Sequence, residues 1–507
     1  MRKYQECLFI LVFVMCMTNL LAQPAGLDNT FDTDGKKCLT IENTDDVRFI
    51  KVDANGKILI GGASQELYND FSVIRLNSDG TVDMTFGDVH GFFEEFQAAI
   101  ISLSSSTDVA NDVAFDADDK IVLAGYAYAS STTQHDVGVA RLNTDGSPDN
   151  TFSSDGKVIH SFAAEDDHVN AVAIDENGKI LMAGYYTTDD LDFRYLIVRL
   201  NADGTLDNTL SGSGYRQLTI FDGYAHSVLA DAGGKFWISG GANVWNGSGT
   251  TPSTVILKFN SDGSFDNSFN GNGQLTIFQQ NSSGIRYGLK ILKDANGKIL
   301  VGGSDIIRVN TDGTMDNSFS SDGIVYIPDF SMRGSSMTID AQGRILAVGT
   351  DESSSDRIKI VRLNSDGSFD NSFDGDGILS LSLGSVEDFA RAVTLDGNQK
   401  ILVLGETLTD NHVNYAEDFC VLRLNGGGAV TSLMEASSAN LKIYPNPSAN
   451  GRFSIESEEK IKEITLVNAL GQKEVFYSSD IQTSLNGLLV AIIETESGMY
   501  SSKIQVE

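Results

Sequence analysis

One eight-residue phrase recurs along the chain and constrains its fold more than any other feature. It reads V-I-R-L-N-S-D-G at 73–80 and I-V-R-L-N-S-D-G at 360–367, and related versions begin at 139, 197, 256, 306 and 421. A second phrase, such as D-A-N-G-K-I-L-I-G-G at 53–62, occurs equally often. Short alternating apolar runs between Gly-, Asn- and Asp-containing turns indicate four strands in each unit. The chain is therefore expected to be an all-β protein with one small sheet per repeat.

The ends of the repeat region distinguish a closed ring from an open solenoid. The phrase D-N-T-F stands before the first complete unit, at 28–31, whereas the last unit stops after L-R-L-N-G-G-G and lacks its own copy. A ring uses this offset, because the first strand then completes the last sheet and closes the circle. We expect a seven-bladed β-propeller over residues 25–430, closed by an N-terminal strand at 36–41.

Two cysteines lie on the strands that this closure makes neighbours. Cys38 belongs to the closing strand, and Cys420 belongs to the third strand of the last unit. We predict a disulfide between them, and two buried free thiols are the alternative. In the chain-entropy model, a disulfide that closes so long a loop stabilises the fold by on the order of 4–5 kcal/mol.

The acidic turns raise the question of calcium. Residues 370–377 read D-N-S-F-D-G-D-G, and the two pairs Asp374/Asp376 and Asp32/Asp34 have the spacing of part of a calcium loop. In most other copies Ser or Asn replaces one or both carboxylates while the glycine stays, and the copy near 87–91 has lost the spacing. This variation favours a hydrogen-bonded turn. Calcium at these four aspartates is the alternative, and no other cofactor is expected.

The two faces of the predicted ring differ in their loops. The turns that follow the first and third strands share one face and are uniform, whereas the loops that follow the second strands and the links between units share the other and vary. Binding sites are usually built from such variable loops on a rigid scaffold. Five aromatic residues in or near them are the candidate ligand-binding residues: Tyr126, Tyr128, Tyr185, Tyr186 and Trp245. Packing between blades is the alternative role of the tyrosines.

Charge and motif content limit the function. The formal net charge is −33, and nucleic-acid binding requires clustered Lys and Arg, so no nucleic-acid partner is expected. No H-E-x-x-H, G-x-S-x-G or P-loop pattern occurs, and the six histidines are scattered singly. We assign no catalytic residue and favour a binding or interaction module. A hydrolase or lyase that acts on extracellular glycan at the ring axis and a structural surface component remain alternatives.

The first 22 residues have the features of a secretory signal peptide. Arg2 and Lys3 form a basic start, an apolar core follows at 8–17, and L-L-A precedes the expected cleavage after Ala22. No later stretch reaches about 18 consecutive apolar residues, so we expect no transmembrane segment in the mature chain.

The repeat region resembles the delta-60 repeat family, which forms β-propellers in bacterial extracellular proteins. The resemblance rests on G-K-I-L-V-G-G, R-L-N-x-D-G and D-N-S-F elements that recur through residues 25–430. It implies a fold and no single activity. Extracellular glycan or protein is therefore the expected class of partner for the propeller.

A small-residue linker at 431–440 precedes a tail of different character at 441–507. Alternating apolar runs in this tail predict a small β-sandwich. The tail resembles the C-terminal sorting domain of the type IX secretion system of Bacteroidetes. The matching residues are Tyr444, Pro445, Asn446, Pro447, Gly451, Gly471, Gly498 and Tyr500. The resemblance implies recognition by the type IX secretion machinery, followed by release into the medium or attachment to the outer-membrane surface.

Overall fold

The computed structural model forms two compact units, residues 25–426 and a second unit that includes residues 427–507. It describes residues 26–506 except for these segments: 40–44, 66–68, 91–95, 131–133, 164, 189–191, 220–221, 246, 248, 279–288, 333–336, 352–356, 384–386, 409–416, 427–433, 436–440, 445–451, 458–459, 469–472, 485–486 and 496–498. The predicted signal peptide lies outside the described residues.

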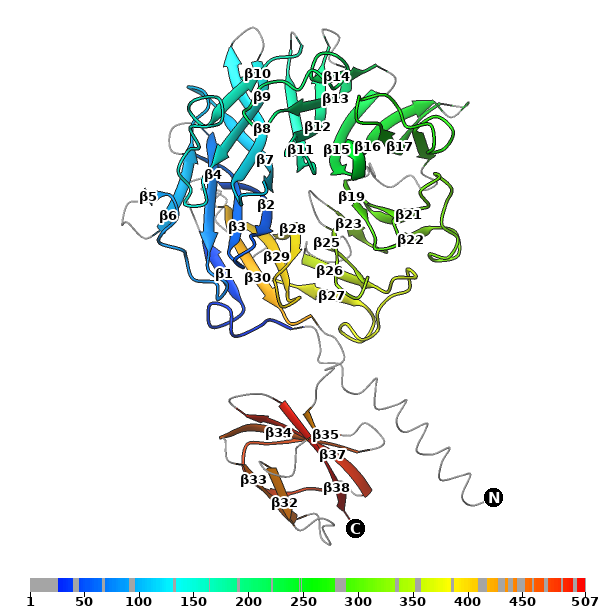
Figure 1. The fold of residues 1–507 in the computed structure, drawn as a ribbon. Helices are drawn as coiled ribbons and strands as arrows, with labels where there is room; N and C mark the ends of the chain where they lie inside the picture. Colours follow the sequence, from blue (N-terminus) through cyan, green and yellow to red (C-terminus); the bar gives the residue numbers. More distant parts are fainter. Residues whose placement is uncertain are drawn as a thin grey trace. The chain divides into compact units, whose positions relative to one another are not determined.

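The described residues of the first unit form seven antiparallel sheets around a central axis, as the sequence predicts for a seven-bladed propeller (Figure 1). Blade 1 contains β2 (Asp45–Val52), β3 (Ile58–Gln65), β4 (Asn69–Leu76), β5 (Asp88–His90) and β6 (Phe96–Ile101). Blade 2 contains β7 (Asp108–Phe115), β8 (Ile121–Ser130), β9 (Gln134–Leu142) and β10 (Lys157–His160). Blade 3 contains β11 (Asp167–Ile174), β12 (Ile180–Thr187), β13 (Phe193–Leu200) and β14 (Tyr215–Leu218).

The remaining blades follow in chain order. Blade 4 contains β15 (Asp222–Ala230), the 3₁₀ turn η1 (Ala232–Gly234), β16 (Phe236–Trp245), β17 (Thr250–Phe259) and β18 (Gln274–Phe278). Blade 5 contains β19 (Lys290–Lys293), β20 (Ile299–Gly302), β21 (Asp305–Val309) and β22 (Ile324–Tyr326). Blade 6 contains β23 (Phe330–Ser331), β24 (Met337–Ile339), β25 (Ile345–Asp351), β26 (Arg357–Leu363) and β27 (Ile378–Leu381). Blade 7 contains β28 (Glu387–Leu395), β29 (Ile401–Leu408), β30 (Glu417–Leu424) and the N-terminal β1 (Lys36–Leu39).

Blade 1 explains why its acidic turn has lost the common spacing. After Gly87 the chain forms β5, turns back, and returns as β6, which pairs with both β4 and β5. Strand β6 thus takes the place that a fourth strand has in the other blades. The extra strand β5 makes blade 1 a five-stranded sheet.

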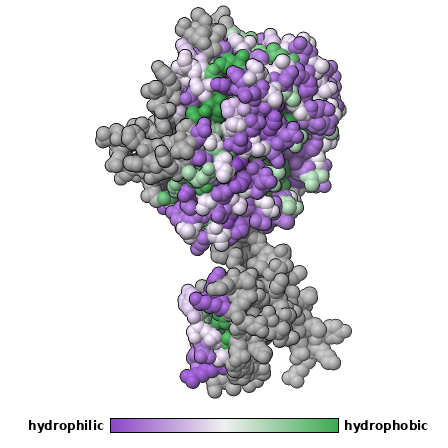
Figure 2. Space-filling view, turned by 60° about the vertical axis from the view of Figure 1, so that its left-hand side comes forward, coloured by the Kyte–Doolittle hydropathy of each residue, from purple (hydrophilic) through white to green (hydrophobic). Residues whose placement is uncertain are grey.

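Hydrophobic side chains fill the space between neighbouring blades. One cluster joins Leu181 and Ile197 of blade 3 to Ile238 and Leu257 of blade 4. Second strands such as β12 and β25 are buried on both faces, because each sheet packs between two neighbouring sheets. The side of the first unit seen in Figure 2 is predominantly hydrophilic.

The innermost strands carry β-bulges with polar residues at the skipped positions. In five of the described innermost strands, one residue is skipped by the pairing: Arg48, Asn111, Asn170, His226 and Arg391. The Arg48 Nη1 donates to Asn111 Oδ1 at 2.9 Å, and Asn111 Nδ2 donates to the carbonyl of Val169 at 2.7 Å. The bulges therefore supply hydrogen bonds that link blades 1, 2 and 3 around the axis.

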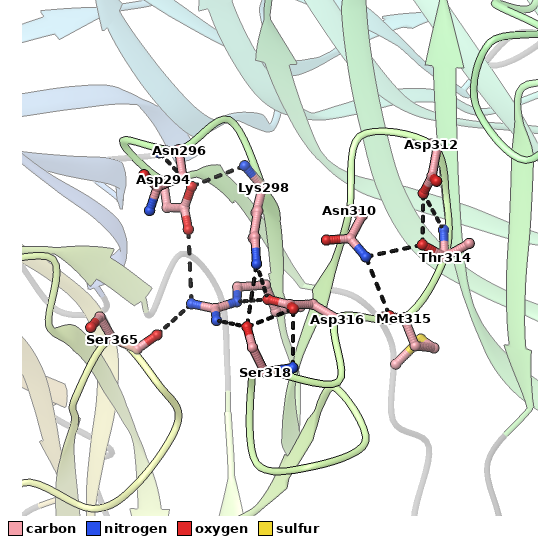
Figure 3. A network of polar contacts seen from close by, with 11 residues as sticks. Asp294, Asn296, Lys298, Asn310, Asp312, Thr314, Met315, Asp316, Ser318 and Ser365 are labelled. Atoms are coloured by element: carbon pink, nitrogen blue, oxygen red, sulfur yellow. Dashed lines mark hydrogen bonds and ion pairs between the residues drawn. The ribbon is translucent and has the colours of Figure 1, made fainter.

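A clamp of charged residues explains why the chain repeats R-L-N and D-N-S-F. In blade 5, Arg308 Nε and Lys298 Nζ both donate to Asp316 Oδ2, at 2.6 and 2.7 Å (Figure 3). The Arg308 guanidinium also donates to the carbonyl of Ser365 in blade 6 and lies 4.5 Å from the ring centroid of Phe319. Arg308 therefore pairs with the aspartate in the turn of its own blade and hydrogen-bonds to the next blade.

The clamp recurs around the ring. Other blades have an equivalent Arg–Asp pair, and these are Arg75–Asp83, Arg141–Asp149, Arg199–Asp207, Arg362–Asp370 and Arg423–Asp28. Blade 4 has Lys258 in place of arginine, 3.3 Å from Asp266. The aspartate of D-N-x-F is thus a buried ion-pair partner, which accounts for its presence in every copy of the repeat.

The ring closes through the pairing of the two ends of the first unit. Strand β1 pairs with β30, and the register places Cys38 opposite Cys420, where a disulfide joins them. Asp28 forms the clamp of blade 7 by accepting from Arg423 Nε at 2.7 Å and from the Lys400 ammonium. The N-terminal segment therefore supplies both a strand and a charge that blade 7 lacks.

The clamp makes stability depend on pH, and we expect the melting temperature to fall as the pH drops from 3.8 towards 2. Burial raises the pKa of Asp28, but hydrogen bonds from Lys400 and Thr30 and the charge of Arg423 outweigh burial and lower the pKa to about 2. The same balance lowers the pKa of Asp83 and Asp149. A carboxyl with a lowered folded-state pKa stabilises the fold above its unfolded pKa and loses that contribution as pH falls through the folded pKa.

Melting curves recorded by circular dichroism between these pH values test this expectation. The Asp28→Asn variant cannot titrate at this position, so its melting temperature should fall less steeply over the same range. Equal slopes for the wild type and Asp28→Asn would show that the clamp at the seam does not contribute to the acid sensitivity.

The acidic turns are built as hydrogen-bonded turns in the structure. Asp376 Oδ1 accepts from the Ile378 amide at 2.9 Å, and Asp34 Oδ1 accepts from the Lys36 amide at 3.1 Å. Asp374 and Asp32 have φ angles of 51° and 42°, in the left-handed region that aspartate enters more readily than most residues. These four residues therefore have a structural role in their turns, as the sequence favours, and calcium binding by them remains an untested alternative.

The second unit contains two described sheets. The first consists of β31 (Met434–Glu435), β38 (Met499–Val506), β37 (Gly487–Thr495), β34 (Ile461–Asn468) and β35 (Lys473–Phe476), and the second of β32 (Leu441–Tyr444), β33 (Arg452–Ser457) and β36 (Asp480–Gln482). Phe453 and Ile481 of the smaller sheet share a hydrophobic cluster with Ile464 and Ile493 of the larger.

Two of the predicted sorting residues lie on these strands, and the others lie outside the described residues. Tyr444 ends β32, and Tyr500 lies in β38. The residues outside the described part are Pro445, Asn446, Pro447, Gly451, Gly471 and Gly498. In the part of the chain that the structure describes, no helix has the length and apolar character needed to cross a bilayer.

Candidate functional site

Aromatic and imidazole rings from blades 2, 3 and 4 meet on the face that carries the variable loops. We define the histidine–tyrosine cluster as Tyr126, Tyr128, His135, His168, Tyr185, Phe193 and Tyr224. Within their blades, these residues lie near the end of a second strand or near the beginning of a first or third strand. Antiparallel pairing brings these strand ends to one face of the ring. The cluster thus occupies the face that the variability of the loops indicates for binding.

His168 is at the centre of the cluster. Its ring centroid lies 4.0 Å from that of Tyr126 and 4.8 Å from that of Tyr185, and the second pair is stacked at 15°. His135 approaches Tyr126 and Tyr128 edge-on, with centroids 5.0 and 5.8 Å away. These offsets and edge-on contacts are favourable geometries for π systems. The rings therefore hold one another in place and form a continuous aromatic surface.

A second group of rings extends the cluster toward blade 4. Tyr185 lies 5.3 Å from Phe193 and 5.7 Å from Tyr224, and Phe193 lies 5.4 Å from Tyr224. Phe193 is 39% exposed, although large apolar side chains at strand positions are usually buried. The outer edge of the cluster therefore offers apolar ring surface to solvent.

Strand alternation decides which tyrosines join the cluster. Tyr185 pairs with His168 across β11 and β12, while the next residue, Tyr186, points to the opposite face of its sheet. Tyr186 is 7% exposed and packs among Val169, Met182 and Leu196. Of the five aromatic residues expected at a ligand site, the structure therefore brings together Tyr126, Tyr128 and Tyr185, and places Tyr186 in the core.

Trp245, the fifth predicted residue, is the last residue of β16 and pairs with Thr250 of β17. This pairing puts its backbone at the second-to-third-strand loop of blade 4, on the same face as the cluster. Its role as a contact residue remains a prediction.

Charged groups border the cluster and are paired with one another. The Arg48 guanidinium donates to the Asp46 carboxylate and to Asn111. Arg194 Nη2 donates to Asp192 Oδ2 at 2.7 Å. The Asp166 Oδ1 accepts from the backbone amide of His135 and lies 3.0 Å from His135 Nδ1. The border of the cluster therefore contains both signs of charge in short-range pairs.

Burial keeps the central rings uncharged at neutral pH. Burial and the neighbouring His135 lower the pKa of His168 to about 4, which leaves its imidazole neutral. Burial, followed by the charge of Asp166, raises the pKa of Tyr185, and burial raises that of Tyr126. The centre of the cluster therefore presents neutral rings with phenol and imidazole groups that both donate and accept hydrogen bonds.

Two histidines of the cluster and the neighbouring Asp166 have the chemistry of metal ligands. Ligand atoms of His135, Asp166 and His168 all lie within 4.8 Å of one another. His135 comes from blade 2 and the other two from blade 3, so the junction between the blades assembles the group. No other group of three or more histidine, cysteine or acidic side chains with this geometry occurs among the described residues.

Most of this site was missed at the level of sequence. Tyr126 and Tyr185 were found because both follow the A-G at the end of a second strand. His135, His168, Phe193 and Tyr224 were not, because they come from different strand ends that only the ring brings together. One available signal was that His168 lies near the start of the first strand of the unit in which Tyr185 lies near the end of the second.

The opposite face holds a pocket of about 340 Å³ between blades 3 and 4, lined in part by Lys179, Arg199 and Asp207. Those three are members of a blade clamp and pair with one another. Their role in the clamp explains why these charged residues are present, so the histidine–tyrosine cluster is the better candidate for a ligand site.

Models of protein families match both units. The description "Domain of unknown function (DUF5122) beta-propeller" matches residues 54–86, 117–152, 176–210, 232–269, 295–319 and 342–373. The description "Secretion system C-terminal sorting domain" matches residues 442–507. The six propeller matches fall in blades 1 to 6, each between a first-to-second-strand turn and the following D-N-x-F element.

Several solved structures are similar to the chain at low identity. A virginiamycin B lyase from Staphylococcus aureus is 14% identical, with a TM-score of 0.45, over 77% of this chain and 99% of that one. PorZ of Porphyromonas gingivalis, described as a surface component of the type-IX secretion system, is 11% identical, with a TM-score of 0.40, over 92% of this chain and 60% of that one. A PL25 ulvan lyase is 11% identical, with a TM-score of 0.33, over 96% of each chain. None of the curated proteins matches the chain.

Proposed function

Because this chain is a seven-bladed propeller of DUF5122 repeats that ends in a type IX sorting domain for export, we propose that it acts at the cell surface or outside the cell as a binding module for a neutral glycan. The histidine–tyrosine cluster is the proposed contact surface. The observation that carries the proposal is the continuous, partly exposed set of rings from His168 and Tyr185 to Phe193.

The chemistry of the cluster suits a sugar. Aromatic rings offer flat apolar area to the C–H faces of a pyranose, while phenol and imidazole groups at their edges hydrogen-bond to hydroxyls. The neutral state of His168 and the paired state of Arg48 leave little unbalanced positive charge to attract an anion. The net charge of −33 further opposes a polyanionic ligand. A neutral glycan therefore fits better than a sulfated or uronate-rich one.

Affinity electrophoresis of the full mature chain in gels that contain neutral or acidic polysaccharides tests the proposal. We expect retardation by at least one neutral polysaccharide and loss of about tenfold in affinity for Tyr185→Ala, which corresponds to about 1.4 kcal/mol. The Tyr185→Phe variant keeps the ring and should retain most of the binding.

Tyr326 provides a matched control. It lies on β22 of blade 5 and is 53% exposed, outside the cluster. The Tyr326→Ala variant should therefore bind like the wild type. Retardation that survives Tyr185→Ala, or that occurs only with acidic polysaccharides, would contradict the proposal.

A further inference from the structure

We propose that His135, Asp166 and His168 bind one divalent transition-metal ion of the zinc class. The site joins two blades, since His135 is the second residue of strand β9 in blade 2 and the other two residues lie at the start of blade 3. This proposal is independent of the glycan, because it concerns the three ligating side chains alone.

The positions of the ligand atoms are close to those of a metal site. Their mutual separations are all within 4.8 Å, and the two imidazole centroids are 5.4 Å apart with planes at 67°. In a tetrahedral zinc site with Zn–N bonds of about 2.0–2.1 Å, neighbouring ligand atoms are about 3.4 Å apart. Asp166 Oδ1 and His135 Nδ1 are already 3.0 Å apart. Small side-chain rotations would therefore bring all three ligands to one ion.

The His168 ring is held in place but is not occupied by a polar partner. Tyr126 and Tyr185 pack against its two sides. Within the described part of the chain, no residue forms a hydrogen bond with the His168 ring. Rings packed against both faces leave the nitrogen atoms at the ring edge, and His168 is not among the described side chains with a buried, unpartnered nitrogen. The ring edge is therefore open to a metal ion shared with Asp166 and His135.

The ligand set favours one class of metal. Two imidazoles and one carboxylate are typical of zinc and neighbouring transition metals, whereas calcium and magnesium prefer sets made of oxygen atoms. The Asp166 carboxylate supplies negative charge, and Arg48, whose charge acts on His168, is paired with Asp46. Three protein ligands leave a coordination position for water or for an oxygen atom of a bound molecule.

Titration of the full mature chain without a polyhistidine tag tests the site. After treatment with a chelator, Co²⁺ should produce the visible absorption of a low-coordinate site at one ion per chain, and Zn²⁺ should displace it. Zn²⁺ should also raise the melting temperature, because an ion that binds only the folded state stabilises it by mass action. Calcium should do neither at this site.

Variants identify the ligands. His135→Ala and His168→Ala should each weaken Zn²⁺ binding by at least about tenfold, since even the loss of an outer-shell partner costs 10–100-fold. His160→Ala is the matched control: His160 is also partly buried, lies on β10 of blade 2, and is outside the group. It should bind Zn²⁺ like the wild type.

Chemical modification of the wild type covers the case in which a variant does not fold. Bound Zn²⁺ should protect His135 and His168, but not His160, from acylation by diethyl pyrocarbonate, as mapped by mass spectrometry. Absence of Zn²⁺ and Co²⁺ binding, unchanged binding in both His135→Ala and His168→Ala, or equal modification of the three histidines with and without Zn²⁺ would overturn the proposal.

Discussion

Replacement of Asp28 by alanine should lower the free energy of unfolding of the propeller by roughly 3–5 kcal/mol, the usual cost of removing one partner of a buried ion pair. Asp28 accepts from Arg423 Nε at 2.7 Å, and the Arg423 side chain is only 8% exposed. The variant leaves this guanidinium with only the more distant Asp396 carboxylate, 3.8 Å from Arg423 Nη1, in a place that water reaches poorly. It also removes a contact that joins the first and last parts of the ring.

Urea denaturation followed by tryptophan fluorescence measures this loss. Trp237 is 1% exposed in blade 4 and reports on unfolding of the core. Asp34→Ala is the control, because Asp34 is an exposed turn residue of the same N-terminal segment. Asp149→Ala removes the equivalent ion pair within blade 2. If Asp28→Ala were as stable as Asp34→Ala, the ion pair would have no part in closing the ring.

Reduction of the Cys38–Cys420 disulfide should destabilise the propeller by roughly 6 kcal/mol in the chain-entropy model, given the 382 positions between the cysteines. The two cysteines are 382 positions apart, so the cross-link removes much of the freedom of the unfolded chain. Denaturation with and without reductant measures the effect. A Cys38→Ser, Cys420→Ser variant should match the reduced wild type and show no further response to reductant.

Alkylation under denaturing conditions without reductant, followed by intact-mass analysis, checks the bond itself. The mature wild type should gain no label, and two added groups would show free thiols. The two seam interactions should also be coupled, because a disulfide keeps the ends close after the ion pair is lost. We therefore expect Asp28→Ala to cost more stability in the reduced protein than in the oxidised one.

The fold was predictable because its information is local and repeated. Each R-L-N-x-D-G and D-N-x-F element specifies a turn between two short strands, and the displaced D-N-T-F at 28–31 indicates a closed ring. The structure adds what the repeats leave implicit, namely that Arg308 and its counterparts reach the next blade. It also adds the hairpin β5–β6 in blade 1, which could not be predicted from the other copies of the repeat.

The candidate site was only partly predictable, for a physical reason. A residue such as Tyr185 is marked by its position at the end of a second strand, so its neighbourhood on a variable face follows from the meander. The approach of His135 to His168 depends instead on how two blades pack side by side. The angle between neighbouring blades cannot be read from the period of the repeat or from the loop sequences. The scattered histidines therefore did not indicate a shared site.

The seam also sets the order in which the native fold is completed. Asp28 and Arg423 are 395 positions apart in the chain. The segment around Asp28 can therefore pair only after the last blade has been synthesised. Such contacts raise contact order and slow folding. Until then blade 7 exposes the unpaired edge of β30, a surface on which strands of other molecules can add. We therefore expect closure of the seam to be slow, and this closure also covers a strand edge that is open to aggregation.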